Sequence, residues 1–179
     1  MKHKKNLTPL NDFVNLLSGG DLRSIGKTNS VVSHIVNQHD FDELFKLIFH
    51  DERLIVMRAI DAIEKITLKH PNYLNKHKKE ILELSSVAFD KELKWHLAQI
   101  IPRLSLTPHE LTKAWKLLTN WALDKNNSRI VRVNSIQGFF EMQKVHSELT
   151  QEFSKTLTEL EKEHIPSINA RIRSIKNKI

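Results

Sequence analysis

The segment Gly20-Asp-Leu-Arg-Ser-Ile-Gly26-Lys27-Thr28 has the residue types of a phosphate-binding loop. A P-loop has four residues between its two glycines, whereas five separate Gly20 from Gly26, and Asp21 stands where the first glycine is required. No strand pattern precedes the segment, so no parallel sheet is expected to hold it. We interpret it as a connection between helices with an exposed basic tip, and nucleotide binding is not predicted.

The chain contains ten histidines, which could serve as metal ligands. None lies in a His-Glu-x-x-His motif, and the absence of cysteine removes the thiolates of a structural zinc site. The pairs His34/His39 and His70/His77 lack the spacing that aims two ligands from one helix face. Scattered surface histidines are the expected arrangement, and no metal is predicted.

Paired carboxylates are the next candidates, because two acids can share general acid and base work. Asp51-Glu52 and Glu161/Glu163 fall near expected helix ends, where capping or solvation accounts for them. No Gly-x-Ser-x-Gly nucleophile elbow is present. The sequence therefore predicts no catalytic residue and no cofactor, and it favours a protein that is not an enzyme without deciding the point.

A repeated pattern determines how these side chains are positioned. The stretch LIVMRAIDAIEKI at 54–66 recurs 38 residues later as ELKWHLAQIIPRL at 92–104, and again after 38 residues as IVRVNSIQGFFEM at 130–142. A weaker copy, NARIRSIKNKI at 169–179, follows with its register one residue later. Apolar and small residues occupy equivalent slots at helical spacing, which is typical of an α-solenoid.

We therefore predict an all-α fold, an α-solenoid of about four stacked antiparallel helix pairs. The prediction is a single domain over 1–179, with N-terminal helices at 1–38 and helix pairs at 40–70, 76–104, 107–142 and 147–179.

Local signals place the helix ends. Thr107 with Glu110 three residues later forms a capping box around a proline, and Asp40 has the same spacing to a glutamate. Pro102 is expected to end or bend its helix, because proline has no backbone N–H to donate. Residues 129–134 alternate like a strand, but the repeat register predicts a helix there.

Two segments carry a motif in which an acidic or polar residue precedes a Val-Arg-like dipeptide, and small and apolar residues follow. They are Asp90-Lys-Glu-Leu93-Lys94 and Ser128-Arg-Ile-Val131-Arg132. This motif resembles the HEAT repeat. The first copy departs from the pattern, with Val56 at the basic position. The resemblance covers about residues 40–179 and extends to small bacterial HEAT-like proteins whose role is unknown. It implies that Asp90, Lys94 and Arg132 belong to a structural ladder between repeats.

A more distant resemblance is to the HEAT-type alkylpurine DNA glycosylases, which hold DNA on a basic concave surface. Their Trp-Asp signature is absent, because Trp95 is followed by histidine, Trp115 by lysine and Trp121 by alanine. No catalytic residue carries over to this sequence.

Composition restricts the partners. The 179 residues include 28 Lys and Arg against 21 Asp and Glu, a formal charge of +7, which favours an acidic or polyanionic partner. No apolar run reaches the roughly 20 residues that span a membrane, and no signal peptide or cysteine is present. We expect a cytoplasmic protein without a membrane partner.

Polar residues of the second helices line up at i, i+3 and i+7 in successive copies, and stepping back one period adds two basic residues near the N-terminus. This second-helix stripe is the predicted binding site, and an ordinary solvated helix face is the alternative interpretation. The stripe comprises Arg23, Lys27, Arg58, Asp61, Lys65, His96, Gln99, Arg103, Gln137, Arg173 and Lys176, with Asn134 and Glu141 at equivalent positions.

Trp95 joins the predicted site because, beside His96, it could offer a stacking surface for a base; packing at the core edge is the alternative. Trp115 and Trp121 are expected in the core of a first helix. The tail from Arg171 has no acidic residue, and it could hold phosphate or complement its own helix dipole.

The predicted function is a non-enzymatic interaction module that binds a protein or another acidic partner along the stripe. The alternative is a nucleic-acid-binding protein distantly related to the repair glycosylases. The sequence leaves the partner and the oligomeric state open.

Overall fold

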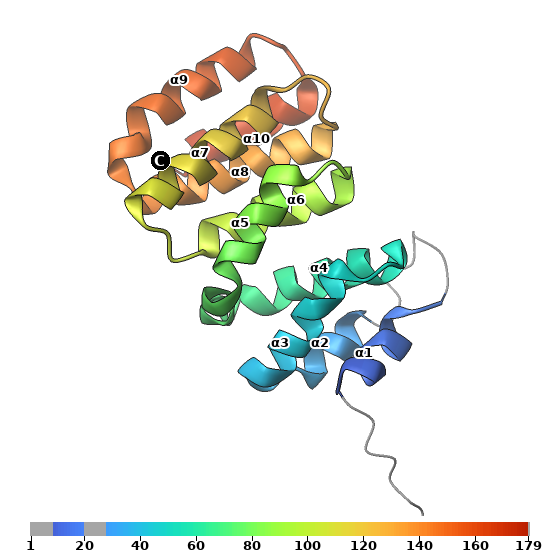
Figure 1. The fold of residues 1–179 in the computed structure, drawn as a ribbon. Helices are drawn as coiled ribbons and strands as arrows, with labels where there is room; N and C mark the ends of the chain where they lie inside the picture. Colours follow the sequence, from blue (N-terminus) through green and yellow to red (C-terminus); the bar gives the residue numbers. More distant parts are fainter. Residues whose placement is uncertain (1–8, 20–27, 179) are drawn as a thin grey trace, which may run out of the picture. The chain divides into compact units, whose positions relative to one another are not determined.

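The computed structural model describes residues 9–19 and 28–178, and every described element is a helix. The chain divides into two compact units, Met1–Tyr73 and Leu74–Ile179, which Figure 1 colours from blue to red along the sequence. The single-domain assignment over 1–179 stays a prediction.

In the first unit, helix α4 is the centre of the packing. Its neighbours are α1, α2 and α3, and its core residues Ile55, Ala59, Ile63 and Ile66 recur at helical spacing and are buried. The described elements are α1 (Pro9–Leu17), α2 (Thr28–His34), α3 (Gln38–Lys46), the 3-10 turn η1 (Leu47–Phe49) and α4 (Arg53–Thr67).

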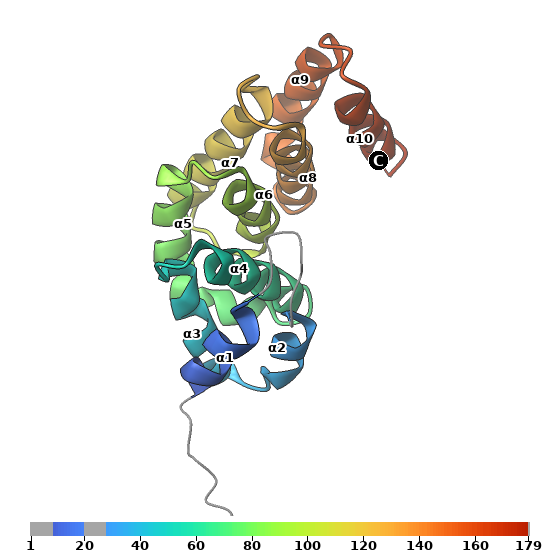
Figure 2. The same cartoon turned by 90° about the vertical axis from the view of Figure 1, so that its right-hand side faces the viewer.

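In the second unit, three helix pairs form two layers: α5, α7 and α9 make one layer, and α6, α8 and α10 the other (Figure 2). Helix α8 packs against α6, α7 and α10. The elements are α5 (Lys78–Val87), α6 (Lys91–Ile100), η3 (Ile101–Arg103), α7 (Pro108–Leu123), α8 (Arg129–Val145), η4 (Ser147–Leu149), α9 (Thr150–Glu161) and α10 (Pro166–Lys176), while η2 (Pro71–His77) crosses the boundary between units. The all-α solenoid is confirmed, and 129–134 is helical.

The capping signals were partly correct. The Thr107 side chain accepts from the Glu110 backbone N–H, and the Glu110 side chain accepts from that of Thr107, so the capping box is confirmed. The assignment to Asp40 is wrong: Asn37 caps α3, and Asp40 instead accepts from the backbone N–H of Val36. Pro102 ends α6 in a 3-10 turn, as expected.

Glu110 gives the capping box a measurable pH dependence. A hydrogen bond from Lys78, whose Nζ lies 2.8 Å from Glu110 Oε2, and then bonds from Thr107 lower the pKa of Glu110 from 4.5 to about 2. Because the folded state holds the charged form, this contribution to stability is complete above pH 4.5 and is lost as the pH falls through about 2.

An NMR titration of the Glu110 carboxyl carbon checks this. Lys78→Met is expected to move the pKa of Glu110 back toward 4.5, whereas Lys79→Met, which removes the neighbouring lysine paired with Glu83, should leave it low. An ordinary pKa in the unmodified protein would contradict the assignment.

Helices α6 and α8 of the second unit approach closely at Gly138 of α8. A Cβ built there would lie 2.4 Å from the backbone oxygen of Ala98 in α6 and 3.0 Å from Leu118 Cδ1 in α7. Glycine therefore lets the backbones of α6 and α8 pack in direct contact, and this holds the two second helices at a fixed separation.

Candidate functional site

Arg58 is not part of an exposed stripe, and that prediction is wrong. The residue is only 4% exposed, and its Nη1 donates to the carbonyl oxygens of Leu17 and Gly19, each at 2.6 Å. These carbonyls lie at the end of α1, where Gly19 has a φ of +74° that ends the helix. Arg58 thus connects α4 to the end of α1 by hydrogen bonds within the first unit.

Arg58→Met keeps the side-chain stem and removes both hydrogen bonds. We expect the free energy of unfolding to fall by about 2 kcal/mol, because a buried hydrogen bond to the Leu17 carbonyl and a partly buried one to the Gly19 carbonyl both lose their charged donor. Urea denaturation followed by circular dichroism measures this. Lys65→Met on the same helix is the control and should cost under about 1 kcal/mol, because Lys65 is half-exposed; equal losses would contradict the role of Arg58.

The remaining stripe residues of the first unit form a local pair. Lys65 Nζ lies 2.7 Å from Asp61 Oδ2 and 3.4 Å from Asn29 Oδ1 of α2. Both Asp61 and Lys65 are half-exposed on α4. Arg23 and Lys27 lie outside the described residues, so their place in the stripe stays a prediction.

On α6, His96 is 7% exposed and therefore does not line an open surface as predicted. Trp95, Gln99 and Arg103 are half-exposed, and the Trp95 ring centroid lies 5.2 Å from that of His96. Gln99 Nε2 turns back onto the carbonyl oxygen of Trp95 at 3.5 Å. Trp115 and Trp121 of α7 are buried in the core, as expected.

The stripe reaches α10 in a different register from the predicted one. Helix α10 begins at Pro166, 37 residues after Arg129 begins α8, so the last copy is one residue early rather than one late. The equivalents of Asn134, Gln137 and Glu141 are then Arg171, Ser174 and Lys178.

Contacts agree with this register. Arg171 Nη1 donates to Gln137 Oε1 of α8 at 2.7 Å, whereas Lys176 Nζ pairs with Glu161 of α9, in the other layer, also at 2.7 Å. Arg173 is exposed two residues from Arg171, about 200° around the helix. The placement of Arg173 and Lys176 on the stripe is therefore wrong, and Arg171 is the residue that was missed.

A polar network connects α8 and α10 along the stripe. Gln137 accepts from Arg171 through its Oε1 and donates through its Nε2 to Glu141 Oε1 at 2.6 Å. Lys144 Nζ lies 2.9 Å from the other Glu141 oxygen and 5.6 Å from the centroid of the Phe140 ring. Arg171 and Lys144 thus lie at the two ends of this hydrogen-bond network, and Glu141 is the acid within it.

Beside this network the surface has a notch of about 300 Å³, lined by Phe140, Glu141, Gln143, Lys144 and Lys178. Phe140 is buried and forms part of the wall, while Lys144 and Lys178 are exposed. The notch offers donors from two ammonium groups and an acceptor from one carboxylate. Its chemistry suits a small anionic group.

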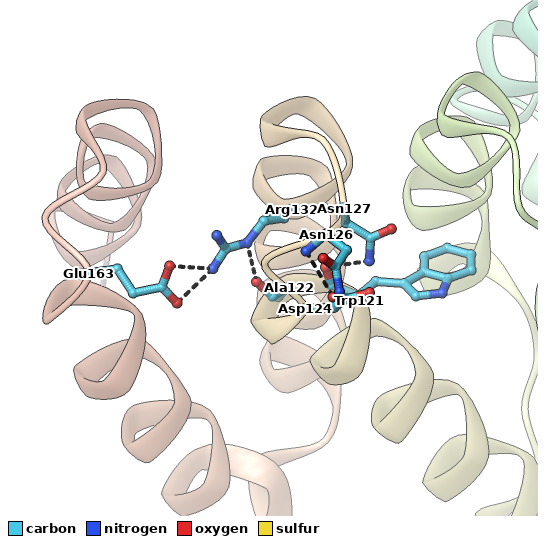
Figure 3. A network of polar contacts seen from close by, with 7 residues as sticks. All are labelled: Trp121, Ala122, Asp124, Asn126, Asn127, Arg132 and Glu163. Atoms are coloured by element: carbon cyan, nitrogen blue, oxygen red, sulfur yellow. Dashed lines mark hydrogen bonds and ion pairs between the residues drawn. The ribbon is translucent and has the colours of Figure 1, made fainter.

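A different set of cations is structural. Arg132 of α8 is 2% exposed; its Nε donates to Ala122 O at 2.7 Å, and its Nη2 donates to both oxygens of Glu163 at 2.7 and 2.9 Å (Figure 3). Lys94 of α6 donates to Asn127 Oδ1 at 2.9 Å. Each cation reaches the turn inside the next helix pair, so the predicted ladder is confirmed for Lys94 and Arg132.

Comparison with known families agrees with this arrangement: the model of the HEAT repeat domain matches residues 20–179. The chain belongs to the HEAT repeat domain family. No curated protein and no solved structure matches the chain, so nothing supports the distant similarity to the alkylpurine DNA glycosylases.

Domains built of HEAT repeats generally mediate protein interactions, and a binding function follows for this one at that level. Over residues 9–19 and 28–178, no helix is long and apolar enough to cross a membrane. Within the same described part of the chain, no three His, Asp or Glu side chains are grouped so that they could hold a metal ion.

The second-helix face of this HEAT domain therefore differs from the predicted stripe in its composition. Two of the predicted side chains, Arg58 and His96, are buried. Arg171 and Lys178, which sequence reasoning assigned only to a basic tail, contact or line the α8 surface. The signal for them was the Pro166 helix start, which sets the register of the last pair.

Proposed function

We propose that this HEAT domain is a non-enzymatic interaction module that binds an acidic protein segment along the second-helix face, through α6, α8 and α10 in the second unit. The corrected face comprises Trp95, Gln99, Arg103, Gln137, Glu141, Lys144, Arg171 and Lys178.

The network between α8 and α10 carries the proposal. Arg171, Lys144 and Lys178 bring three positive charges to a surface whose network contains one acid, Glu141. Half-exposed amides at Gln99 and Gln137 add neutral hydrogen-bonding groups beside them. An acidic segment complements this combination, because ionised carboxylates accept from arginine, lysine and amide donors.

The alternative partner, nucleic acid, receives less support from the same surface. Of the cations in the predicted stripe, Arg58 is buried within the protein, and Arg173 and Lys176 lie off the second-helix face. Phosphate binding depends on the number of cations that neutralise the backbone. Fewer available cations lower the expected affinity for a polyanion more than for a short acidic segment.

Fluorescence anisotropy with a labelled peptide of alternating glutamate and serine tests the proposal. Arg171→Glu is expected to weaken binding about tenfold, or roughly 1.4 kcal/mol. Lys116→Glu makes the same charge change at an exposed position of α7, in the other layer, and should leave the affinity close to that of the unmodified protein.

Two results would contradict the proposal. Equal losses in the Arg171 and Lys116 variants would mean that binding follows net charge rather than this face. Tighter binding of a labelled single- or double-stranded oligonucleotide, with a log–log salt slope of about −0.9 per phosphate contact on duplex DNA, would favour the nucleic-acid alternative.

A further inference from the structure

Glu141 is held by donors of the kind that also bind a ligand carboxylate. Its Oε1 accepts from Gln137 Nε2 at 2.6 Å and its Oε2 from Lys144 Nζ at 2.9 Å. Arg171 orients the Gln137 amide, because the arginine can only donate and so must meet the amide oxygen. The amide N–H₂ is thereby directed at Glu141, and the network presents donors to a carboxylate.

The site retains positive charge after Glu141 is satisfied. Arg171 and Lys144 are used on the network, while Lys178 lines the notch next to it and is exposed. The Phe140 ring lies below Lys144, with the ammonium 5.6 Å from its centroid. This contact favours an ammonium that stays at the notch even when its carboxylate partner changes.

We propose that the notch at the ends of α8 and α10 binds one carboxylate of an acidic partner segment, and that Glu141 competes with it for Lys144. The proposal rests on the proposed function and adds the position at which an acidic residue is recognised. The incoming carboxylate pairs with Lys178 and takes Lys144 from Glu141, which keeps its bond from Gln137. The charge of Glu141 therefore opposes binding and sets a limit on affinity.

This arrangement predicts that removing the charge of Glu141 tightens binding of an acidic peptide more than the same change in net charge elsewhere on the protein. Glu141→Gln keeps an oxygen that can accept from Gln137 and removes the negative charge beside Lys144. We expect about fivefold tighter binding of the alternating glutamate–serine peptide, the upper end of the effect of one exposed ion pair. Lys178→Gln is expected to weaken binding by a similar factor.

Matched controls separate the local effect from the general field. Glu159→Gln changes the net charge by the same amount at an exposed position of α9, in the other layer, and Lys116→Gln does so for the lysine variant. Both controls should bind within about twofold of the unmodified protein, because exposed charges farther than a Debye length are largely screened at physiological salt. A peptide with glutamine at every glutamate position should not distinguish Glu141→Gln from the unmodified protein.

The outcomes distinguish this inference from the proposed function. If Glu141→Gln and Lys178→Gln bind the acidic peptide like their controls while Arg171→Glu still loses affinity, the notch is not the recognition point and the partner lies elsewhere on the face. If the acidic peptide does not bind the unmodified protein at all, the proposed function fails with it. If inorganic phosphate or an oligonucleotide shows the Glu141→Gln gain and the peptide does not, the ligand is a phosphate and the carboxylate assignment is overturned.

Discussion

Arg132→Ala is expected to lower the free energy of unfolding by roughly 4 kcal/mol, the cost of breaking a buried ion pair by removing one partner. The substitution leaves the carbonyl oxygen of Ala122 without its donor and the Glu163 carboxylate, whose side chain is 14% exposed, without its cation. Urea denaturation followed by circular dichroism gives the loss, with the slope of the transition showing whether unfolding remains cooperative.

Lys176→Ala is the matched control, because the Lys176–Glu161 pair has the same 2.7 Å separation but is exposed, and it joins α9 to α10 within the last helix pair. It should cost under about 1 kcal/mol. A difference between the two variants measures what burial adds to an ion pair of equal length. Similar small losses would mean that Arg132 does not hold the last helix pair in place.

Gly138→Ala is expected to destabilise the second unit by about 3 kcal/mol, near the upper end of the cost of overpacking a core. The added Cβ would lie 2.4 Å from the Ala98 carbonyl oxygen, and a backbone atom cannot rotate away as a side chain can. Helix α6 must therefore separate from α8. Alanine gains roughly 1 kcal/mol over glycine in a helix, which is too little to reverse the sign.

The control for this prediction is Asn134→Ala, one turn earlier on α8 at a half-exposed position. It exchanges a polar residue for the same alanine without a clash and should change stability by under about 1 kcal/mol. Thermal denaturation of both variants checks the difference. A Gly138→Ala variant as stable as the unmodified protein would show that α6 and α8 separate at little cost.

The repeat predicted the architecture because every copy must bury the same slots against its neighbours. The equivalence of Ala62, Ile100 and Gly138 followed from the 38-residue period, and all three are buried. The direct backbone contact at Gly138 did not follow from it, because a small residue in a core slot is compatible with several helix separations. Only the position of the Ala98 carbonyl decides that glycine is needed.

The candidate site was harder to predict, since exposure is a property of the whole chain. Arg58 has the type and spacing of a solvated residue. The two carbonyls to which it donates belong to Leu17 and Gly19, which lie 41 and 39 positions earlier and outside the repeat. Arg171 was missed because a weak final copy allows more than one alignment. Shifting a helix by a single residue turns the assigned face by about 100°.

The two confirmed ladder contacts have a consequence for cooperativity. In a stacked array, stability is a sum of terms for each pair and terms between neighbours, and weak neighbour terms let the ends fray. Arg132 joins the end of α7 to the turn before α10, and Lys94 likewise reaches the turn before α8. These contacts at the turns add to the packing of α8 against α6 and α10. We therefore expect the terminal pair to open together with the pair before it, as one block.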